Sequence, residues 1–275
     1  MMKAKWVKMM AVALVTVSAS LLFTACGSEK KETKSESQGG TLKVAMSATF
    51  PPFEYVDGKT QKYAGIDVDI ANYIAGKLGK KLEVTDMKFA SLIPTLQSGR
   101  ADMVISGISP TAKRSEVVSF TKPYFYPPKA IVAKKRTNFS TLEALKGHKV
   151  GAAMGTTYVQ ELQSVSGIDV VELDSATMAV QDVLNGRLDA AVCDGTHAIV
   201  FCKEHPELEM HMLKLATSND DTFAIAFPKD SKDVEKVNAI LDEMKKNGEF
   251  HKILVKHMGE EQTADYEKKV KELGL

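Results

Sequence analysis

Short apolar runs alternate with longer amphipathic stretches along most of the chain. The short runs are mostly flanked by Gly, Asp or Ser, and they predict strands at residues 41–47, 81–87, 102–106, 149–154, 169–174, 189–194 and 222–227. The longer stretches repeat their apolar positions with a helical period, and they predict helices at residues 67–79, 177–186, 234–248 and 249–259. Because strands alternate with helices, we expect an α/β fold with mainly parallel sheets.

One phrase of the sequence occurs twice. L-Q-S-G-R-A-D-M-V-I-S at residues 96–106 is echoed by L-N-G-R-L-D-A-A-V-C at residues 184–193. In both copies we expect a helix to stop at Gly and a buried strand to lead into a polar loop. We assign one copy to each of two lobes, although any helix–strand unit can share such a pattern by chance. Ligands of open α/β sheets bind beyond the carboxyl ends of strands, so the loops at residues 106–114 and 194–197 are expected to face one cleft.

The start of the chain has the features of an export signal. Lysines precede an uncharged run at residues 9–23, which is shorter than the roughly 20 residues of a transmembrane helix. The run ends in T-A-C-G, which resembles the lipobox of bacterial lipoproteins. This resemblance implies a signal peptide at residues 1–25 and lipidation, such as palmitate, at Cys26. Phe23 stands where leucine is usual, and a plain secretory peptide or an uncleaved signal anchor are the alternatives.

Composition and charge narrow the range of partners. The segment at residues 26–40 contains Ser and many charges but no large apolar residue, which predicts a flexible tether. Lys and Arg number 36 against 35 Asp and Glu, so the net charge of +1 provides no strong field to attract nucleic acid, and we expect no such partner. Two cysteines remain beyond the tether, Cys193 and Cys202, and the predicted helix between them favours free thiols over a disulfide.

The loop at residues 106–114 has the composition of an anion site. Gly107 and Ser109 allow backbone N–H groups to approach a ligand closely. Arg114 follows on a helical turn and offers a planar guanidinium that matches a carboxylate. An ordinary surface arginine with an ion-pair partner is the alternative.

Four further residues complete a candidate cleft. Thr156 and Thr157 open a helix after Gly155, where unpaired N–H groups and a hydroxyl suit a carboxylate, although plain N-capping gives the same pattern. Asp194 ends a buried strand, where a carboxylate needs a cation such as a ligand ammonium group. The alternative is that Asp194 caps the next helix. Phe50 lies in a proline-stiffened loop and covers either an apolar ligand surface or the core.

These motifs resemble the extracytoplasmic solute-binding proteins of polar amino-acid ABC transporters, bacterial solute-binding protein family 3. The resemblance covers residues 41 to about 259 and rests on FPPFEY, GIDVDIANYIAGKLG, FASLIPTLQSGRADMVISGISPTAKR, FTKPYF, KVGAAMGTT and NGRLDAAVCD in this order. It implies a two-lobed, periplasmic-binding-protein-like (type II) flytrap fold. The implied division is lobe 1 at 41–126 and 227–275, lobe 2 at 132–220, and crossovers near 127–131 and 221–226. We expect the lobes to be open without ligand and to close around it.

The resemblance also implies function and location. The expected ligand is a free L-amino acid, and the expected partners are ABC permease and ATPase subunits. No cofactor is expected, and the protein is expected to be a monomer that lies outside the cytoplasmic membrane and is held to it by the lipid at Cys26.

Residue roles at the two charged ends of the ligand follow from the same resemblance. Arg114 corresponds to the arginine that binds the α-carboxylate, with help from the backbone at Ser109 and Thr157. Asp194 corresponds to the acid that binds the α-ammonium group, and Gly107 to a position whose carbonyl also accepts from it.

The pocket for the ligand side chain is less determined by the sequence. Phe50 corresponds to an aromatic residue that stacks on the ligand, and Phe89 is expected to line the same pocket. Ser47 stands where relatives with basic or amide ligands often carry an acid, which weakens the case for arginine, lysine or glutamine. Asp220 and Asp221 could restore negative charge, so a basic ligand stays open.

Two other classes of function use this fold. One is an enzyme like cyclohexadienyl dehydratase, which needs an acid or base aimed at the reacting atom as well as an anion site. The sequence assigns no second carboxylate or His to the cleft, and Asp67 is expected to cap its helix. The six His residues are scattered, His197 lying nearest the expected cleft, so we expect neither a metal site nor an enzyme. An amino-acid sensing module is the other alternative.

Overall fold

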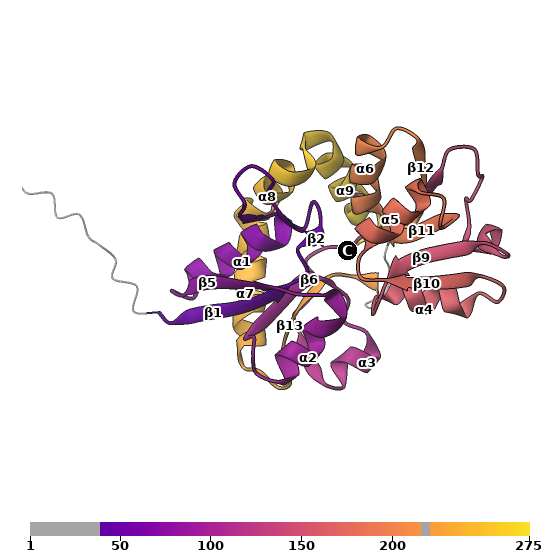
Figure 1. Cartoon of the computed structure of the whole chain (residues 1–275). Coiled ribbons are helices and arrows are strands. Elements are labelled where there is room, and N and C mark those ends of the chain that lie inside the picture. The colour runs from indigo at the N-terminus through magenta and orange to yellow at the C-terminus, as the bar shows by residue number, and fades with distance from the viewer. Residues whose placement is uncertain (1–38, 216–220) are drawn as a thin grey trace, which may run out of the picture. The chain divides into compact units, whose positions relative to one another are not determined.

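The computed structural model describes residues 39–215 and 221–275. The expected signal peptide, Cys26, the expected tether up to residue 38, and Asp220 lie outside these residues. The described part contains two five-stranded sheets and one three-stranded sheet (Figure 1). None of its helices combines the length and apolar character needed to cross a membrane.

The first sheet has the strand order β5-β1-β6-β13-β7. Its strands are β1 (Thr41–Met46), β5 (Lys81–Asp86), β6 (Met103–Ile108), β7 (Val118–Phe120) and β13 (Ala224–Pro228). β1 runs parallel to β5 and β6, whereas β13 runs antiparallel to β6 and β7. Helices α1 (Ile66–Lys77), α7 (Asp233–Lys246) and α8 (Glu249–Met258) cover one face, and α2 (Leu92–Gln97) covers the other (Figure 1). We call this sheet with its helices lobe 1.

The second sheet has the order β10-β9-β11-β8-β12. Its strands are β8 (Pro128–Lys134), β9 (Lys149–Ala153), β10 (Asp169–Leu173), β11 (Ala190–Asp194) and β12 (Leu208–Leu215). β9 is parallel to β10 and β11, and β8 is antiparallel to β11 and β12. Helices α5 (Ala176–Leu184) and α6 (Gly195–Glu204) pack on one face, and α4 (Thr157–Ser164) with the 3₁₀ turn η2 (Leu142–Leu145) packs on the other. This sheet with its helices is lobe 2.

Several short elements connect or extend the sheets. The three-stranded sheet consists of β2 (Thr49–Phe50), β3 (Glu54–Val56) and β4 (Tyr63–Ala64), and it belongs to lobe 1 between β1 and α1. The 3₁₀ turn η1 (Phe89–Ser91) precedes α2, α3 (Ala112–Ser115) follows β6, and α9 (Glu260–Glu272) ends the chain. The sequence patterns did not predict α9, since only Thr263 and Tyr266 of its residues are buried and its apolar stripe is correspondingly thin.

The repeated phrase occupies the same place in the two lobes, as predicted. After α2 the chain turns at Gly99 with φ of 69° and enters β6, and after α5 it turns at Gly186 with φ of 70° and enters β11. The aspartate of each copy accepts a hydrogen bond from a lysine N–H at 2.8 Å, Asp102 from Lys43 and Asp189 from Lys149. Each aspartate therefore fixes its turn to the neighbouring strand, β1 or β9, and the carboxyl ends of β6 and β11 carry the loops expected at the cleft.

The chain passes twice between the lobes. The first passage leads from β7 to β8 and the second from β12 to β13. The expected crossovers at 127–131 and 221–226 overlap the first residues of β8 and β13. Phe125 and Phe223 lie next to each other on the two passages and exchange backbone hydrogen bonds of 2.9 and 3.4 Å. Tyr266 of α9 stacks on Phe125 with ring centroids 4.3 Å apart and accepts a hydrogen bond from the Tyr126 N–H.

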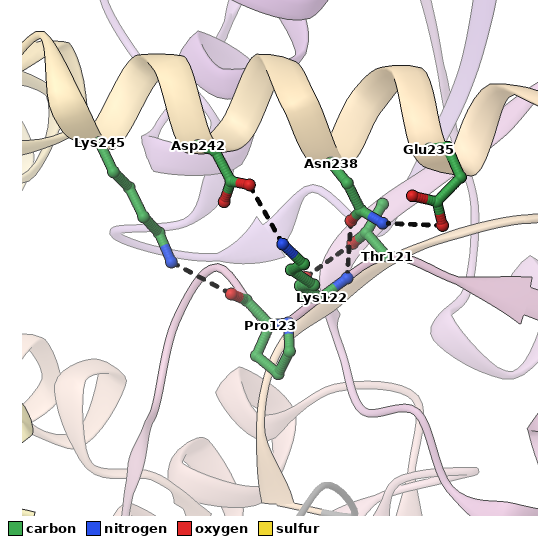
Figure 2. Close-up of polar contacts among 7 residues, drawn as sticks. All are labelled: Thr121, Lys122, Pro123, Glu235, Asn238, Asp242 and Lys245. Atoms are coloured by element: carbon green, nitrogen blue, oxygen red, sulfur yellow. Dashed lines mark hydrogen bonds and ion pairs between the residues drawn. The ribbon is translucent and has the colours of Figure 1, made fainter. Parts of the chain in front are cut away.

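Helix α7 anchors the segment that enters the first passage, as Figure 2 shows. The Lys122 N–H donates to Asn238 Oδ1 at 2.8 Å, and the Lys122 ammonium pairs with Asp242 at 3.1 Å. Lys245 donates to the Pro123 carbonyl at 3.2 Å. The C-terminal part of the chain thus holds the start of the passage in lobe 1, which explains why β13 and α7 complete this lobe.

Candidate functional site

One cavity lies between the two lobes at the carboxyl ends of β6 and β11. All nine residues expected at the ligand site line it: Ser47, Phe50, Phe89, Gly107, Ser109, Arg114, Thr156, Thr157 and Asp194. Its volume is about 60 Å³, whereas one water molecule needs about 10–15 Å³. The cavity therefore accommodates a small solute in place of several waters.

Arg114 spans the two lobes at one side of the cavity. Its backbone N–H is capped by the Thr111 hydroxyl at 3.3 Å, which starts the short helix α3. The guanidinium donates through Nη1 to the Ser109 carbonyl at 2.7 Å and through Nη2 to the Gly155 carbonyl of lobe 2 at 2.8 Å. It also lies over the Phe89 ring, 5.5 Å from the centroid. Arg114 is therefore held in a defined orientation at the cavity and is not an ordinary surface arginine.

The start of α4 faces the cavity from lobe 2. Thr156 is the N-cap residue, but its hydroxyl donates to the Ala153 carbonyl at 2.6 Å and does not cap the helix. Thr156, Thr157 and Tyr158 all line the cavity. The N–H groups of the first turn and the positive end of the helix dipole are thus directed to the region beside Arg114, which suits an anion.

Asp194 is fully buried at the end of β11. Its Oδ1 accepts a hydrogen bond from the His197 N–H at 2.8 Å, and its Oδ2 has no hydrogen-bond partner within the described ranges. Burial raises the pKa of the Asp194 carboxyl to about 7. The two interpretations of Asp194 are therefore compatible, because one oxygen caps α6 and the other is left for a cation or donor in the cavity.

Glu54 is a cavity residue that the sequence analysis missed. It is 0% exposed, and its Oε1 accepts a hydrogen bond from the Ser106 hydroxyl. Its Oε2 receives no hydrogen bond from an N–H or hydroxyl donor among the residues described, and the Glu54 and Asp67 carboxyl groups interact with each other. Burial and the nearby Asp67 carboxylate hold the pKa of Glu54 well above its usual range. The expectation that no second carboxylate lies in the cleft was wrong, because Glu54 pairs with Phe50 across β2 and β3 and lines the cavity with it.

Asp67 has a different role from the one expected. The N-cap of α1 is Gly65, and no side chain caps this helix. The Asp67 carboxylate instead accepts hydrogen bonds from the Gly107 N–H at 2.9 Å and from the Tyr124 hydroxyl at 2.8 Å. Burial raises its pKa to about 6. Asp67 does not line the cavity, and it fixes the backbone of Gly107, which does.

Phe50 both lines the cavity and packs into the core. Its ring stacks on Phe53 at 4.8 Å and meets Phe223 edge-on at 6.0 Å. Gly107 has a φ of +51°, and a Cβ at this position would lie 2.5 Å from Phe50 Cε1. Glycine is therefore required at residue 107 by both its backbone conformation and the close approach of Phe50.

Acidic residues near the crossover are distributed differently from the expectation. Asp221 does not line the cavity, and its carboxylate pairs with Lys129 at 2.7 Å. Asp174 lines the cavity from lobe 2 and pairs with Lys88 of lobe 1 at 2.7 Å. The further acidic side chains at the cavity are therefore Glu54, whose raised pKa favours the neutral form, and Asp174, whose charge is paired with Lys88.

The described cysteines and histidines form no further site. Cys193 and Cys202 are both free thiols, as expected, and Cys193 is buried. No group of three or more His, Cys, Asp or Glu side chains in the ranges 39–215 and 221–275 has the arrangement of a metal site. His197 is buried beside the cleft but does not line the cavity.

Among the described residues, several contacts join the lobes around the cavity. Besides the contacts of Arg114 with Gly155 and of Lys88 with Asp174, the Thr177 hydroxyl of α5 donates to the Thr49 carbonyl at 3.1 Å. The rings of Phe50 and His197 also meet, with centroids 5.0 Å apart. A molecule in the cavity is thus enclosed by residues of both lobes.

Comparison with known proteins gives a consistent family assignment. The family described as bacterial extracellular solute-binding proteins, family 3, matches residues 42–260. The arginine-binding extracellular protein ArtP of Bacillus subtilis (strain 168) is 35% identical over 254 residues, which cover 90% of this chain and 96% of that protein. A solved structure of an ancestral arginine-binding protein bound to arginine is 40% identical, with a TM-score of 0.75, and the match covers 80% of this chain and 99% of that one. The structure with glutamine bound gives the same values.

Proposed function

The chain belongs to the bacterial extracellular solute-binding proteins, family 3, and from this premise we propose that its cleft binds one free L-α-amino acid for delivery to an ABC importer. The relatives named for arginine binding and the ancestral protein solved with arginine and with glutamine support this proposal. The observation that carries it is the placement of one arginine and two buried carboxyl groups around a single cavity between the lobes.

The ligand carboxylate binds beside Arg114. A guanidinium carries five N–H donors in a fixed plane, and the carbonyls of Ser109 and Gly155 hold that plane in position. The Ser109 backbone and the first turn of α4 at Thr157 add donors from the two lobes. A carboxylate placed here therefore exchanges its hydration shell for preorganised donors, which is favourable because little further ordering is needed.

The ligand ammonium group binds at Asp194. Its Oδ2 is buried without a partner, and a buried carboxylate oxygen is costly unless it receives a hydrogen bond or a cation. The Gly107 carbonyl accepts a second hydrogen bond from the ammonium group. A zwitterionic α-amino acid supplies the charge that each of these two positions needs.

The ligand side chain points to the floor of the cavity, which Glu54, Ser47 and Ser106 form together. Glu54 Oε2 receives no hydrogen bond from an N–H or hydroxyl donor in the described residues. The raised pKa favours a neutral Glu54 without ligand, and an ionised Glu54 needs a positive charge or a strong donor. A guanidinium or ammonium side chain supplies both, and a side-chain amide supplies the donor alone. We therefore place arginine first and glutamine second among the candidates, with Phe50 and Phe89 covering the aliphatic part of the side chain.

Thermal-shift screening of the purified protein against the twenty amino acids tests this assignment. A ligand that binds only the native state raises the melting temperature with concentration. Arginine is expected to give the largest shift, and D-arginine is the matched control, since it has the same charge and composition. Equal shifts with both enantiomers, or none with any amino acid, would contradict the proposal.

The protein acts as a carrier and not as a catalyst in this proposal, and the relatives found are named as binding proteins. Glu54 and Asp194 nevertheless have raised pKa values, so the alternative of a dehydratase deserves a direct test. Mass spectrometry after prolonged incubation is expected to recover the bound amino acid unchanged, and any turnover would favour the enzyme. An amino-acid sensing module is the other alternative, which co-transcription with permease and ATPase genes would argue against.

The remaining parts of the proposal concern motion and location. We assign residues 41–126 and 227–275 to one moving body and 132–220 to the other, with the bend near 127–131 and 221–226. The protein is a monomer held to the outer side of the membrane by lipid at Cys26. Membrane fractionation tests this attachment. The wild type is expected in the membrane pellet and Cys26→Ser in the soluble fraction.

A further inference from the structure

The side chain of His197 is buried without any hydrogen bond. The residue lies in the first turn of α6, is 0% exposed, and neither Nδ1 nor Nε2 has a partner in the described part of the chain. A buried polar group without a partner is costly, so the position invites an explanation. The His197 backbone N–H donates to Asp194, which lines the ligand cavity, but the ring itself does not line it.

Aromatic rings surround the imidazole. The Phe201 ring lies 4.0 Å away on the same helix, and the Phe50 ring meets it edge-on at 5.0 Å and 73°. Phe50 belongs to lobe 1 and His197 to lobe 2, so this contact forms only when the lobes come together. Phe50 in turn lines the ligand cavity. His197 is therefore the residue of lobe 2 that packs against Phe50, and Phe50 is one wall of the ligand cavity.

We propose that His197 is a positioning residue that holds Phe50 against the ligand only while its imidazole is neutral, so that closure of the cleft on an amino acid expels a proton from this ring at acidic pH. This inference rests on the proposed binding of an amino acid between closing lobes. The inference adds a proton release from the protein during closure, and the ligand itself neither gains nor loses a proton in this step.

No charged group compensates a positive charge on the ring. Titratable side chains on α6 and on the elements beside it are Cys202, Lys203 and Glu204 on α6, Cys193 and Asp194 on β11, Lys129 and Lys134 on β8, Glu209 and His211 on β12, Asp265, Tyr266 and Lys269 on α9, and Glu54 on β3. None of them hydrogen-bonds the imidazole; Asp194 receives the backbone N–H only, Lys129 pairs with Glu161 and Asp221, and Glu209 with His211. Burial alone lowers the pKa of His197, to about 3.

The direction of the pH effect follows from the difference between the pKa of His197 in the open cleft and its pKa in the closed cleft. In an open cleft the ring is hydrated and titrates near the ordinary value of about 6.5. In the closed cleft it stays neutral down to about pH 3. Above pH 6.5 closure needs no proton release from His197, so this ring does not weaken binding there. Below it, each unit of pH is expected to weaken ligand affinity by up to about tenfold.

Calorimetric titration at pH 7.5 and 5.5 tests the proposal, with L-arginine as the first probe and otherwise the amino acid that gives the largest thermal shift. The dissociation constant of the wild type is expected to rise by about three- to tenfold at pH 5.5. His197→Leu removes the titrating ring, so whatever its affinity at pH 7.5 it is expected to lose most of this rise between pH 7.5 and 5.5. His251→Leu is the matched control, because His251 is an exposed partner of Glu267. This variant is expected to keep the wild-type dependence of ligand affinity on pH.

A merely structural role gives a different result. If His197 only fills space, His197→Leu weakens or preserves binding equally at both pH values and keeps the wild-type slope, which would overturn the proposal. NMR titration of the His197 ring provides a second readout that needs no variant. It is expected to titrate near pH 6.5 without ligand and to stay neutral with saturating ligand, and titration near 6.5 in both states would also overturn the proposal. Wild-type binding without pH dependence contradicts this inference alone, whereas no binding at either pH contradicts the proposed function as well.

Discussion

Arg114 of lobe 1 donates a hydrogen bond through Nη2 to the carbonyl of Gly155 in lobe 2, and the two atoms lie 2.8 Å apart. The same guanidinium faces the cavity in which we place the ligand carboxylate. Ligand binding and contact between the lobes therefore share one side chain. This arrangement couples occupancy of the cleft to its closure, since a bound carboxylate holds Arg114 in the orientation that reaches Gly155.

Closure on the ligand is the first prediction. Small-angle X-ray scattering of the free protein is expected to give a larger radius of gyration than scattering with saturating amino acid, because the inter-lobe contacts at Gly155, Asp174 and Thr177 are favoured by the ligand. A non-binding D-amino acid at the same concentration serves as the control. An unchanged radius with saturating ligand would argue against a moving cleft.

Removal of the guanidinium gives the second prediction. Arg114→Ala is expected to weaken binding by roughly 100-fold, about 3 kcal/mol, because the ligand carboxylate loses charged donors in a desolvated site. Arg187→Ala is the control, since Arg187 pairs with Asp182 on the surface outside the cavity. Calorimetry measures both variants, and wild-type affinity in Arg114→Ala would remove the central residue of the anion site.

Glu54 provides a test of side-chain selectivity. Glu54→Gln retains the size of the side chain and removes its charge, so arginine is expected to lose about ten- to thirtyfold in affinity while glutamine loses much less. Competition between the two amino acids for the same variant gives the ratio directly. Glu83→Gln, at an exposed position of β5, is the matched control. An unchanged ratio would move the side-chain site away from Glu54.

Gly107 supplies a prediction about stability. In Gly107→Ala the new Cβ would meet Phe50 at 2.5 Å, and the backbone has a φ of +51° that disfavours alanine. The unfolding free energy is expected to fall by about 2 kcal/mol or more, which corresponds to roughly 4–8 °C in melting temperature. Gly58→Ala has nothing within 4 Å of the new Cβ, and calorimetric unfolding is expected to show little change there. Equal melting temperatures of the two variants would contradict the packing argument.

Several cleft residues could be expected near the cleft from the sequence, because each of them follows a strand that the apolar pattern predicts. Gly107, Arg114 and Asp194 each lie at the end of a buried strand or just beyond it, and strands of this kind end at one edge of a sheet. Their expected place at the cleft followed from the α/β topology. The two-lobed fold and the roles of these residues were implied by the resemblance to the family, and the repeated phrase was read directly from the sequence.

Other residues depended on contacts between distant parts of the chain. Glu54 lines the cavity, where it accepts a hydrogen bond from Ser106 of β6, and Asp67 bonds to Gly107 forty residues later instead of capping its own helix. Helix α9 buries few residues, and Tyr266 is held by Phe125, which lies far away in the sequence. Such relationships are set by tertiary packing, and no local period or motif of these segments reveals them.

In the proposed complex, Arg114 of lobe 1 binds the carboxylate of a free amino acid and Asp194 of lobe 2 binds its ammonium group. Calorimetry with the best-binding amino acid, its methyl ester and its Nα-acetyl derivative tests this directly, since the ester removes the charge that Arg114 binds and acetylation removes the charge that Asp194 binds. We predict tight binding of the free amino acid and a loss of at least about 100-fold for each derivative. Comparable affinity for either derivative would contradict the assignment.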